Sequence, residues 1–229
     1  MRLLLTRAAE DCERTRAKLE AAGHTVIVSP VFVFERTDES WPRRRPDGLI
    51  ATSSRAFSAA SDEARPDVAQ VPLYLVGQRT EDAARRHGFD GPATVAPDGA
   101  ALAAILGKLP AMRLLYLAGV DRKPDIEEAL ADAGHRLMVI ETYEAVAAAA
   151  LTPDAVAALR DDALDGVLHY SRRSAAIFLA LAAQAGIDPA GPTHVCLSAD
   201  VAGVFRAAKC GDVQVAPTPD EVGMLSLIA

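Results

Sequence analysis

The chain of 229 residues repeats itself, and this internal repeat constrains the fold more than any single motif does. Three separated stretches of the first half recur in the second half, in the same order. The matched stretches are 1–5 with 112–116, 22–24 with 133–135, and 47–53 with 165–171. We therefore expect two halves built on the same plan.

Short β-like runs alternate with helix-like stretches in each copy, which is typical of parallel βα units. The predicted strands are 2–6, 25–31, 48–52, 72–76, 93–95, 112–117, 136–142, 166–170, 193–197 and 213–216. The glycines predicted to end helices are Gly23, Gly88, Gly134 and Gly186. Such positions favour a residue that tolerates positive φ. Thr218 and Glu221 have the spacing of a capping box. The pattern predicts an α/β fold with two parallel-sheet lobes.

Two strand-like segments, about 32–37 and 140–146, stand between the second and third strands of their copies. Both alternate apolar and polar residues and are placed as connections between lobes. The lobes are either contiguous copies or copies that exchange their first βαβ pieces across these connections. Periodicity does not choose between the two arrangements.

Composition narrows the function classes. Half of the residues are hydrophobic and 24% are charged, as in globular proteins. The net charge of −7 argues against general binding to nucleic acid or to an anionic membrane. Three cysteines without a CxxC spacing indicate neither a disulfide framework nor a zinc site, and no glycine-rich phosphate loop occurs. No run approaches the ~20 apolar residues of a membrane span. We expect a cytoplasmic monomer without metal or cofactor.

Polar turns follow four of the predicted strands. These turns are Thr52–Arg55, Gly77–Thr80, Tyr170–Ser174 and Ser198–Asp200. Open parallel sheets bind ligands at the carboxyl ends of their strands, where backbone N–H groups, hydroxyls and arginines suit carboxylate or phosphate groups. The turns therefore predict an anionic ligand between the lobes. The alternative is that their serines and threonines only cap helices.

Three further features have plainer interpretations. The run Arg43-Arg44-Arg45 is expected to be a solvated loop, because charge runs usually stay in water. Cys196 lies in an apolar run and is expected to be an inert buried thiol. His169 stands beside a strand end, where it either packs in the core or faces the ligand.

Short motifs in a fixed order along the whole chain resemble one family. They are Leu4-Leu5-Thr6-Arg7, Gly23-His24, Ala51-Thr52-Ser53-Ser54-Arg55, Val76-Gly77, Tyr116-Leu117-Ala118-Gly119, Tyr143, Ser171-Arg172-Arg173-Ser174 and the turn at Ser198. Together they are similar to the uroporphyrinogen-III synthase family. The resemblance implies two flavodoxin-like lobes joined by a two-stranded connector, with the first βαβ piece completing the lobe of the C-terminal third. The lobes would be 1–33 with 148–229, and 38–140, with connectors at about 33–38 and 140–148.

The resemblance also implies the reaction, that of a hydro-lyase. The linear tetrapyrrole hydroxymethylbilane loses its hydroxyl as water and closes to uroporphyrinogen III, with its D ring inverted through a spiro intermediate. No cofactor is needed, because the pyrrole nitrogen drives hydroxyl loss. The substrate carries eight carboxylates, which strand-end amides, hydroxyls and arginines can meet.

The residues expected to act are one tyrosine and a set of binding groups. Tyr143, in the second connector, is expected to donate a hydrogen bond to the departing hydroxyl, since a phenol stays protonated at neutral pH. The expected substrate-binding residues are Arg7, Thr52, Ser53, Ser54, Gly77, Arg79, Gly119, Ser171, Arg172 and Ser198. Asp200 departs from the family pattern and would repel the substrate unless it points away or pairs with an arginine.

A second function, from another class, fits the repeated lobes equally well. It is a two-lobed cytoplasmic binding protein that closes on a small anionic ligand without catalysis. Tyr143 in the connector favours the enzyme.

Overall fold

The computed structural model describes residues 1–38, 40–60, 66–122 and 124–228. Its strands are β1 (Arg2–Leu5), β2 (Thr25–Val28), β3 (Phe32–Arg36), β4 (Gly48–Ala51), β5 (Leu73–Val76), β6 (Ala93–Ala96), β7 (Arg113–Gly119), β8 (Arg136–Ala147), β9 (Gly166–His169), β10 (Thr193–Cys196) and β11 (Val213–Val215). Its helices are α1 (Ala9–Ala21), α2 (Arg55–Ala60), α3 (Pro66–Ala69), α4 (Gln78–Arg86), α5 (Gly99–Leu106), α6 (Asp125–Asp132), α7 (Pro153–Arg160), α8 (Arg172–Gln184), α9 (Ala199–Ala207) and α10 (Glu221–Leu225). Each predicted strand is confirmed.

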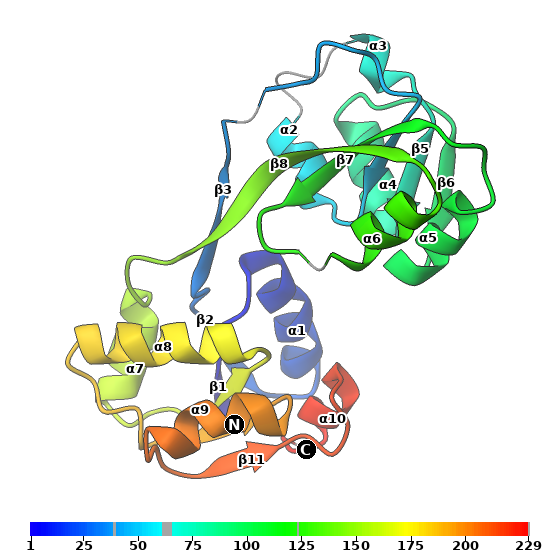
Figure 1. The fold of residues 1–229 in the computed structure, drawn as a ribbon. Helices are drawn as coiled ribbons and strands as arrows, with labels where there is room; N and C mark the ends of the chain where they lie inside the picture. The colour runs from blue at the N-terminus through cyan, green and yellow to red at the C-terminus, as the bar shows by residue number, and fades with distance from the viewer. Residues whose placement is uncertain (39, 61–65, 123, 229) are drawn as a thin grey trace. The chain divides into compact units, whose positions relative to one another are not determined.

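The chain divides into two compact units, unit 1 (1–33 with 146–229) and unit 2 (34–145). Unit 1 contains a sheet in the order β11-β10-β9-β1-β2, and every recorded pair in it is parallel. The other sheet has the order β3-β8-β7-β4-β5-β6, and its β8-β7-β4-β5-β6 part is parallel. The long β8 and the short β3 pair with each other where the chain passes between the units (Figure 1). The α/β class with parallel sheets is confirmed.

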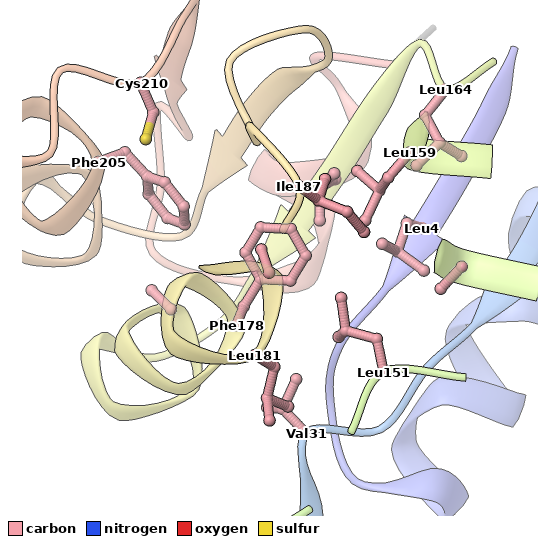
Figure 2. Close-up of a cluster of buried hydrophobic side chains, with 14 of the residues drawn as sticks. Leu4, Val31, Leu151, Leu159, Leu164, Phe178, Leu181, Ile187, Phe205 and Cys210 are labelled. Carbon is pink, nitrogen blue, oxygen red and sulfur yellow. The ribbon is translucent and has the colours of Figure 1, made fainter. Parts of the chain in front are cut away.

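Both faces of each sheet are buried, which explains why the strands read as nearly continuous apolar runs. In unit 2, Leu115 and Leu117 of β7 enter one core, while Leu114 and Tyr116 enter the core on the opposite face. In unit 1 the main core joins Leu4 of β1 with side chains of α7, α8 and α9, several of which converge in Figure 2. Within the described residues, no helix has the length and apolar composition to cross a membrane.

The helix-ending glycines adopt the backbone predicted for them, with φ between +65° and +87° at Gly23, Gly88, Gly134 and Gly186. The capping box predicted at Thr218 and Glu221 is wrong. Asp220 is the N-cap of α10, and its carboxylate accepts from the backbone N–H of Gly223 at 2.7 Å. Glu221 instead turns to α1, where its carboxylate accepts from the hydroxyl of Thr15 at 2.7 Å.

A pair of histidines lies buried in unit 1. Nε2 of His169 is 3.0 Å from Nδ1 of His194, and Nε2 of His194 is 2.9 Å from the carbonyl of Pro189. Since that carbonyl requires a donor, the arrangement assigns the proton of His194 to Nε2 and the shared proton to His169. The aromatic rings of Phe178 and Phe205 enclose the pair. His169 is therefore a core residue and does not face a ligand.

This pair predicts a loss of stability in mild acid. Burial, and for His169 also the neighbouring His194, lower the pKa of both imidazoles below the ordinary value. The unfolded chain then binds more protons than the folded chain below about pH 6.5, so stability is complete above that pH and falls as the pH decreases. We expect the free energy of unfolding, measured in urea, to fall between pH 7.5 and about pH 5.5 by about 1–3 kcal/mol more in wild type than in a His169→Leu/His194→Leu variant. Parallel pH profiles for the two proteins would contradict this assignment.

Candidate active site

A cavity of about 720 Å³ opens at the carboxyl ends of the strands of unit 2. Thr52 follows β4, Val76 ends β5 and Gly119 ends β7, so the cavity lies where parallel sheets bind ligands. The polar and aromatic side chains that line it further are Asp98, Tyr116, Asp121, Arg122, Asp125 and Tyr143. Of the predicted site residues, Thr52, Gly119 and Tyr143 are brought together here.

A β-bulge in β8 brings Tyr143 opposite Gly119. Ala118 pairs with Glu141 and Gly119 with Tyr143, so Thr142 is the extra residue of the longer strand. Bulges commonly re-aim side chains beside active sites. The hydroxyl of Thr142 turns inward and donates to the carbonyl of Ala118 at 3.2 Å, which satisfies that carbonyl.

Gly119 provides the space that the Tyr143 ring occupies. A Cβ atom at position 119 would lie 2.8 Å from Cε2 and Cζ of Tyr143 and 3.0 Å from its hydroxyl oxygen. Phe34 of β3 packs edge-on against the same ring, with 5.8 Å between ring centroids. The Tyr143 ring thus packs between the backbone of Gly119 and the ring of Phe34.

A second phenol lies in the cavity. The Tyr116 hydroxyl is 3.0 Å from Oγ1 of Thr52, although the two residues are 64 positions apart. Tyr116 is almost fully buried, and this burial raises the pKa of its phenol. The phenol therefore stays protonated at neutral pH, and either hydroxyl can be the donor in the bond between them.

Arg122 is fixed beside the two tyrosines. Its guanidinium donates to the carbonyl of Gly119 at 3.0 Å and to the carboxylate of Glu141 at 2.6 Å, and it also pairs with Glu127. These contacts engage Nε and Nη1 of its guanidinium within the wall of the cavity. Neither Arg122 nor Tyr116 was among the site residues predicted from the sequence, although Arg122 lies three residues after the end of β7 and the strand-end rule applies to it.

The cavity carries more acidic than basic groups. Asp98 is the N-cap of α5, and its carboxylate accepts from the backbone N–H of Ala101 at 2.8 Å. Asp125 begins α6, and Asp121 lies in the preceding loop. Against these three carboxylates stands only the paired guanidinium of Arg122 among the described lining residues. With three carboxylates and one guanidinium among these residues, the cavity does not resemble a binding site for a small inorganic anion.

The other predicted residues of unit 2 lie on the neighbouring turns. The hydroxyl of Ser53 accepts from the backbone N–H of Arg55 at 3.3 Å, and Ser54 directly precedes α2. Gly77, with φ of +77°, is the N-cap of α4, and Arg79 is exposed in the first turn of that helix. These residues do not line the cavity described above.

In unit 1, Arg7 is engaged by its own surroundings. Its guanidinium lies 3.9 Å from the ring centroid of Tyr170, donates to Thr15 at 3.2 Å and is 3.7 Å from the carboxylate of Glu221. Its side chain is 24% exposed, and the carboxylate of Glu221 balances its charge.

The turns after β9 and β10 cap their helices and meet through one ion pair. Ser171 accepts from the backbone N–H of Ser174 at 3.1 Å, and Ser198 accepts from that of Val201 at 3.4 Å. Arg172 pairs with Asp200 at 3.0 Å, with both side chains well exposed. Asp200 is therefore compensated by an arginine, which was one of the two arrangements compatible with an anionic substrate.

The part of the chain that the structure describes offers neither a metal-binding cluster nor a reactive thiol among Cys12 and Cys196. No group of three or more His, Cys, Asp or Glu side chains there is arranged to hold a metal. Burial raises the pKa of the Cys12 and Cys196 thiols to about 12, so neither is a nucleophile at neutral pH.

Two solved structures share this fold. The crystal structure of uroporphyrinogen-III synthetase from Helicobacter pylori matches with a TM-score of 0.63 at 18% identity, over 100% of this chain and 98% of that chain. A mutant uroporphyrinogen III synthase from the extremely thermophilic bacterium Thermus thermophilus matches with a TM-score of 0.50 at 17% identity, over 100% and 97%. No curated protein sequence matches the chain significantly.

The model of the family described as uroporphyrinogen-III synthase HemD matches residues 13–226. The chain belongs to the uroporphyrinogen-III synthase family. It is accordingly a lyase of tetrapyrrole biosynthesis, which cyclises hydroxymethylbilane to uroporphyrinogen III with inversion of the D ring and loss of water. Its small-molecule partner is a tetrapyrrole.

For this member of the uroporphyrinogen-III synthase family, Gly119→Ala tests the position of Tyr143. The added Cβ overlaps the tyrosine ring, so the ring must leave its place, at a cost of about 1–3 kcal/mol of stability. We expect isomer-III formation to fall at least about tenfold, the size of one misplaced donor. The matched control is Gly203→Ala, where no atom lies within 4 Å of the new Cβ. Wild-type activity in Gly119→Ala would show that the ring position is immaterial.

Proposed function

We propose that the cavity of unit 2 is where the hydroxyl of hydroxymethylbilane departs, and that Tyr143 donates a hydrogen bond to it. The observation that carries this proposal is the Tyr143 ring lodged against Gly119 inside the cavity. The Tyr116 hydroxyl, paired with Thr52, stands in the same cavity as a second donor. Among the described residues, burial raises the pKa of the Cys12 and Cys196 thiols to about 12, and no group of three or more His, Cys, Asp or Glu side chains is arranged to hold a metal.

The acidic groups of the cavity suit the cation that this step creates. When the C–O bond breaks, its electrons leave with the oxygen and the pyrrole nitrogen supplies the pair that forms the new double bond to the methylene carbon. The ring then carries positive charge, which the carboxylates of Asp98, Asp121 and Asp125 stabilise. Closure of the macrocycle onto ring D later releases a proton. This proton and the hydroxide that has left together make up the water that is lost.

Tyr143→Phe keeps the ring and removes only the donor. We expect isomer-III formation to slow by ~10–1,000-fold with little change in melting temperature, the span of one positioned proton donor. The assay is incubation with hydroxymethylbilane, oxidation, and separation of the porphyrin isomers. Tyr74→Phe is the matched control, because Tyr74 is a buried tyrosine of unit 2 outside the cavity. Activity of Tyr143→Phe within about twofold of that control would return Tyr143 to a packing role.

We propose further that units 1 and 2 are flavodoxin-like lobes related by the internal repeat. Their sheets have the strand orders β2-β1-β9-β10-β11 and β8-β7-β4-β5-β6. When each strand is replaced by its match in the other copy of the repeat, the two orders are the same. In each lobe the first two strands come from one copy and the last three from the other. This order supports copies that exchange their first βαβ pieces, with connectors at about 33–38 and 140–148.

Matched polar contacts support the repeat. The amino group of Met1 lies 3.3 Å from Nδ1 of His24, and the backbone N–H of Met112 donates to Nδ1 of His135 at the same distance. Similarly, the N–H of Arg2 donates to Asp165 at 2.5 Å and the N–H of Arg113 to Asp47 at 2.9 Å. Each of these two contacts in one lobe has its counterpart in the other.

Lobe two is continuous in sequence, so it can be tested alone. We expect residues 34–145, expressed without the rest of the chain, to unfold in one cooperative urea transition, because they hold a complete sheet with a core on each face. Circular dichroism and tryptophan fluorescence should report coincident midpoints. A fragment without a cooperative transition would contradict its assignment as a domain.

The remaining expectations belong to the same proposal. The turns with Ser53, Ser54, Gly77 and Arg79 would meet substrate carboxylates in lobe two. In lobe one, Arg7, Ser171, Arg172 and Ser198 would do so. The enzyme would act as a cytoplasmic monomer, without nucleic acid, membrane, metal or cofactor.

A further inference from the structure

A second cavity of unit 2, of about 400 Å³, is lined by five arginines. Three of them form the loop Arg43-Arg44-Arg45, and the others are Arg113 and Arg136, the first residues of β7 and β8. The cavity shares no residue with the cavity of Tyr143. Since β7 runs from Arg113 to Gly119, the two cavities lie at opposite ends of one strand, roughly 20 Å apart.

The charge at this second cavity is only partly compensated. Asp47 is bound by the guanidinium of Arg113 at 2.8 and 3.2 Å and by its backbone N–H at 2.9 Å. Hydrogen bonds from Arg113 lower the pKa of this carboxyl to about 2, so Asp47 contributes one permanent negative charge. Arg44 and Arg136 form no ion pair with any residue that the structure describes. A positive cluster thus persists on a chain whose net charge is −7.

The arginine cavity also has an apolar wall. Pro42, Pro46, Leu137 and Met138 line it beside the guanidinium groups, and Met138 is 38% exposed. Guanidinium groups bind carboxylates in a bidentate manner, and the two prolines restrict the loop between them, which reduces the entropy lost on binding. A bare inorganic ion would leave the apolar wall unused. An apolar body edged with several carboxylates uses both parts.

We infer that the arginine cavity is a second binding site for the carboxylate edge of a tetrapyrrole. The volume lies within the range of about 300–1,000 Å³ typical of small-molecule sites, at its small end, so the site takes the edge of the macrocycle rather than the whole of it. The choice of a tetrapyrrole as the ligand rests on the reaction of the family. The cavity and its positive charge are observed in the structure and are independent of that reaction. The Arg43–Arg45 run, expected from sequence to be a plain solvated loop, is part of this site.

The test counts bound ligand. Uroporphyrin III, the stable oxidised product, is titrated into the full chain by calorimetry at low ionic strength. We expect Arg44→Gln/Arg136→Gln to bind one equivalent fewer than wild type, and the control Arg86→Gln/Arg206→Gln, which removes the same charge from exposed helix positions, to bind as wild type does. Equal stoichiometry in wild type and Arg44→Gln/Arg136→Gln would overturn the inference.

A second arm tests the nature of the ligand. Met138→Ser should weaken the arginine-dependent equivalent of uroporphyrin by ~5–30-fold, because apolar contact is lost, and leave the affinity for inorganic tripolyphosphate unchanged. Unchanged uroporphyrin affinity in Met138→Ser would mean that the site binds anions of any shape, which overturns the tetrapyrrole assignment. Isomer-III formation by the wild-type enzyme, measured separately, distinguishes failure of this inference from failure of the enzymatic function.

Discussion

Strand β7, hydrogen-bonded to β4 and to β8, supports most of unit 2. Its side chains alternate into two cores, so the strand cannot shift by one residue without exchanging the two sets of apolar groups. Its first residue, Arg113, holds Asp47, and its last residue, Gly119, receives the ring of Tyr143. Both polar sites of this unit are therefore placed by one register, which the burial of leucines on either face determines.

The bulge at Thr142 adjusts this rigid frame locally. A regular ladder would set Thr142, not Tyr143, opposite the end of β7. The extra residue moves the aromatic ring onto Gly119, and the hydroxyl of Thr142 compensates the carbonyl that the broken ladder would leave unpaired. The bulge thus depends on a hydroxyl at one position and a missing side chain at another. Because the two positions lie on different strands, the sequence of either strand alone does not predict the bulge.

The sequence predicted elements better than contacts. Strands and helix ends follow from local signals, such as the apolar runs and the glycines with positive φ at Gly23 and Gly134. The pairing of Thr52 with Tyr116 and that of His169 with His194 were not predicted. Such contacts depend on strand order and register, which periodicity leaves open. The capping box failed for a related reason, because Glu221 serves the distant Thr15 and not its own helix.

The acidity of the Tyr143 cavity also has a local cause. Helix N-termini favour negative charge, and the carboxylates of Asp98 and Asp125 occupy the starts of α5 and α6. At the start of α5, one of the N–H groups that the strand-end rule offers to an anionic ligand is already satisfied by the chain itself, because the backbone N–H of Ala101 donates to Asp98. Under the proposed function, the same carboxylates that repel an acidic side chain would stabilise a pyrrole cation. In that proposal the cavity takes the ring that loses its hydroxyl, and the acidic side chains of the substrate would be bound by other turns.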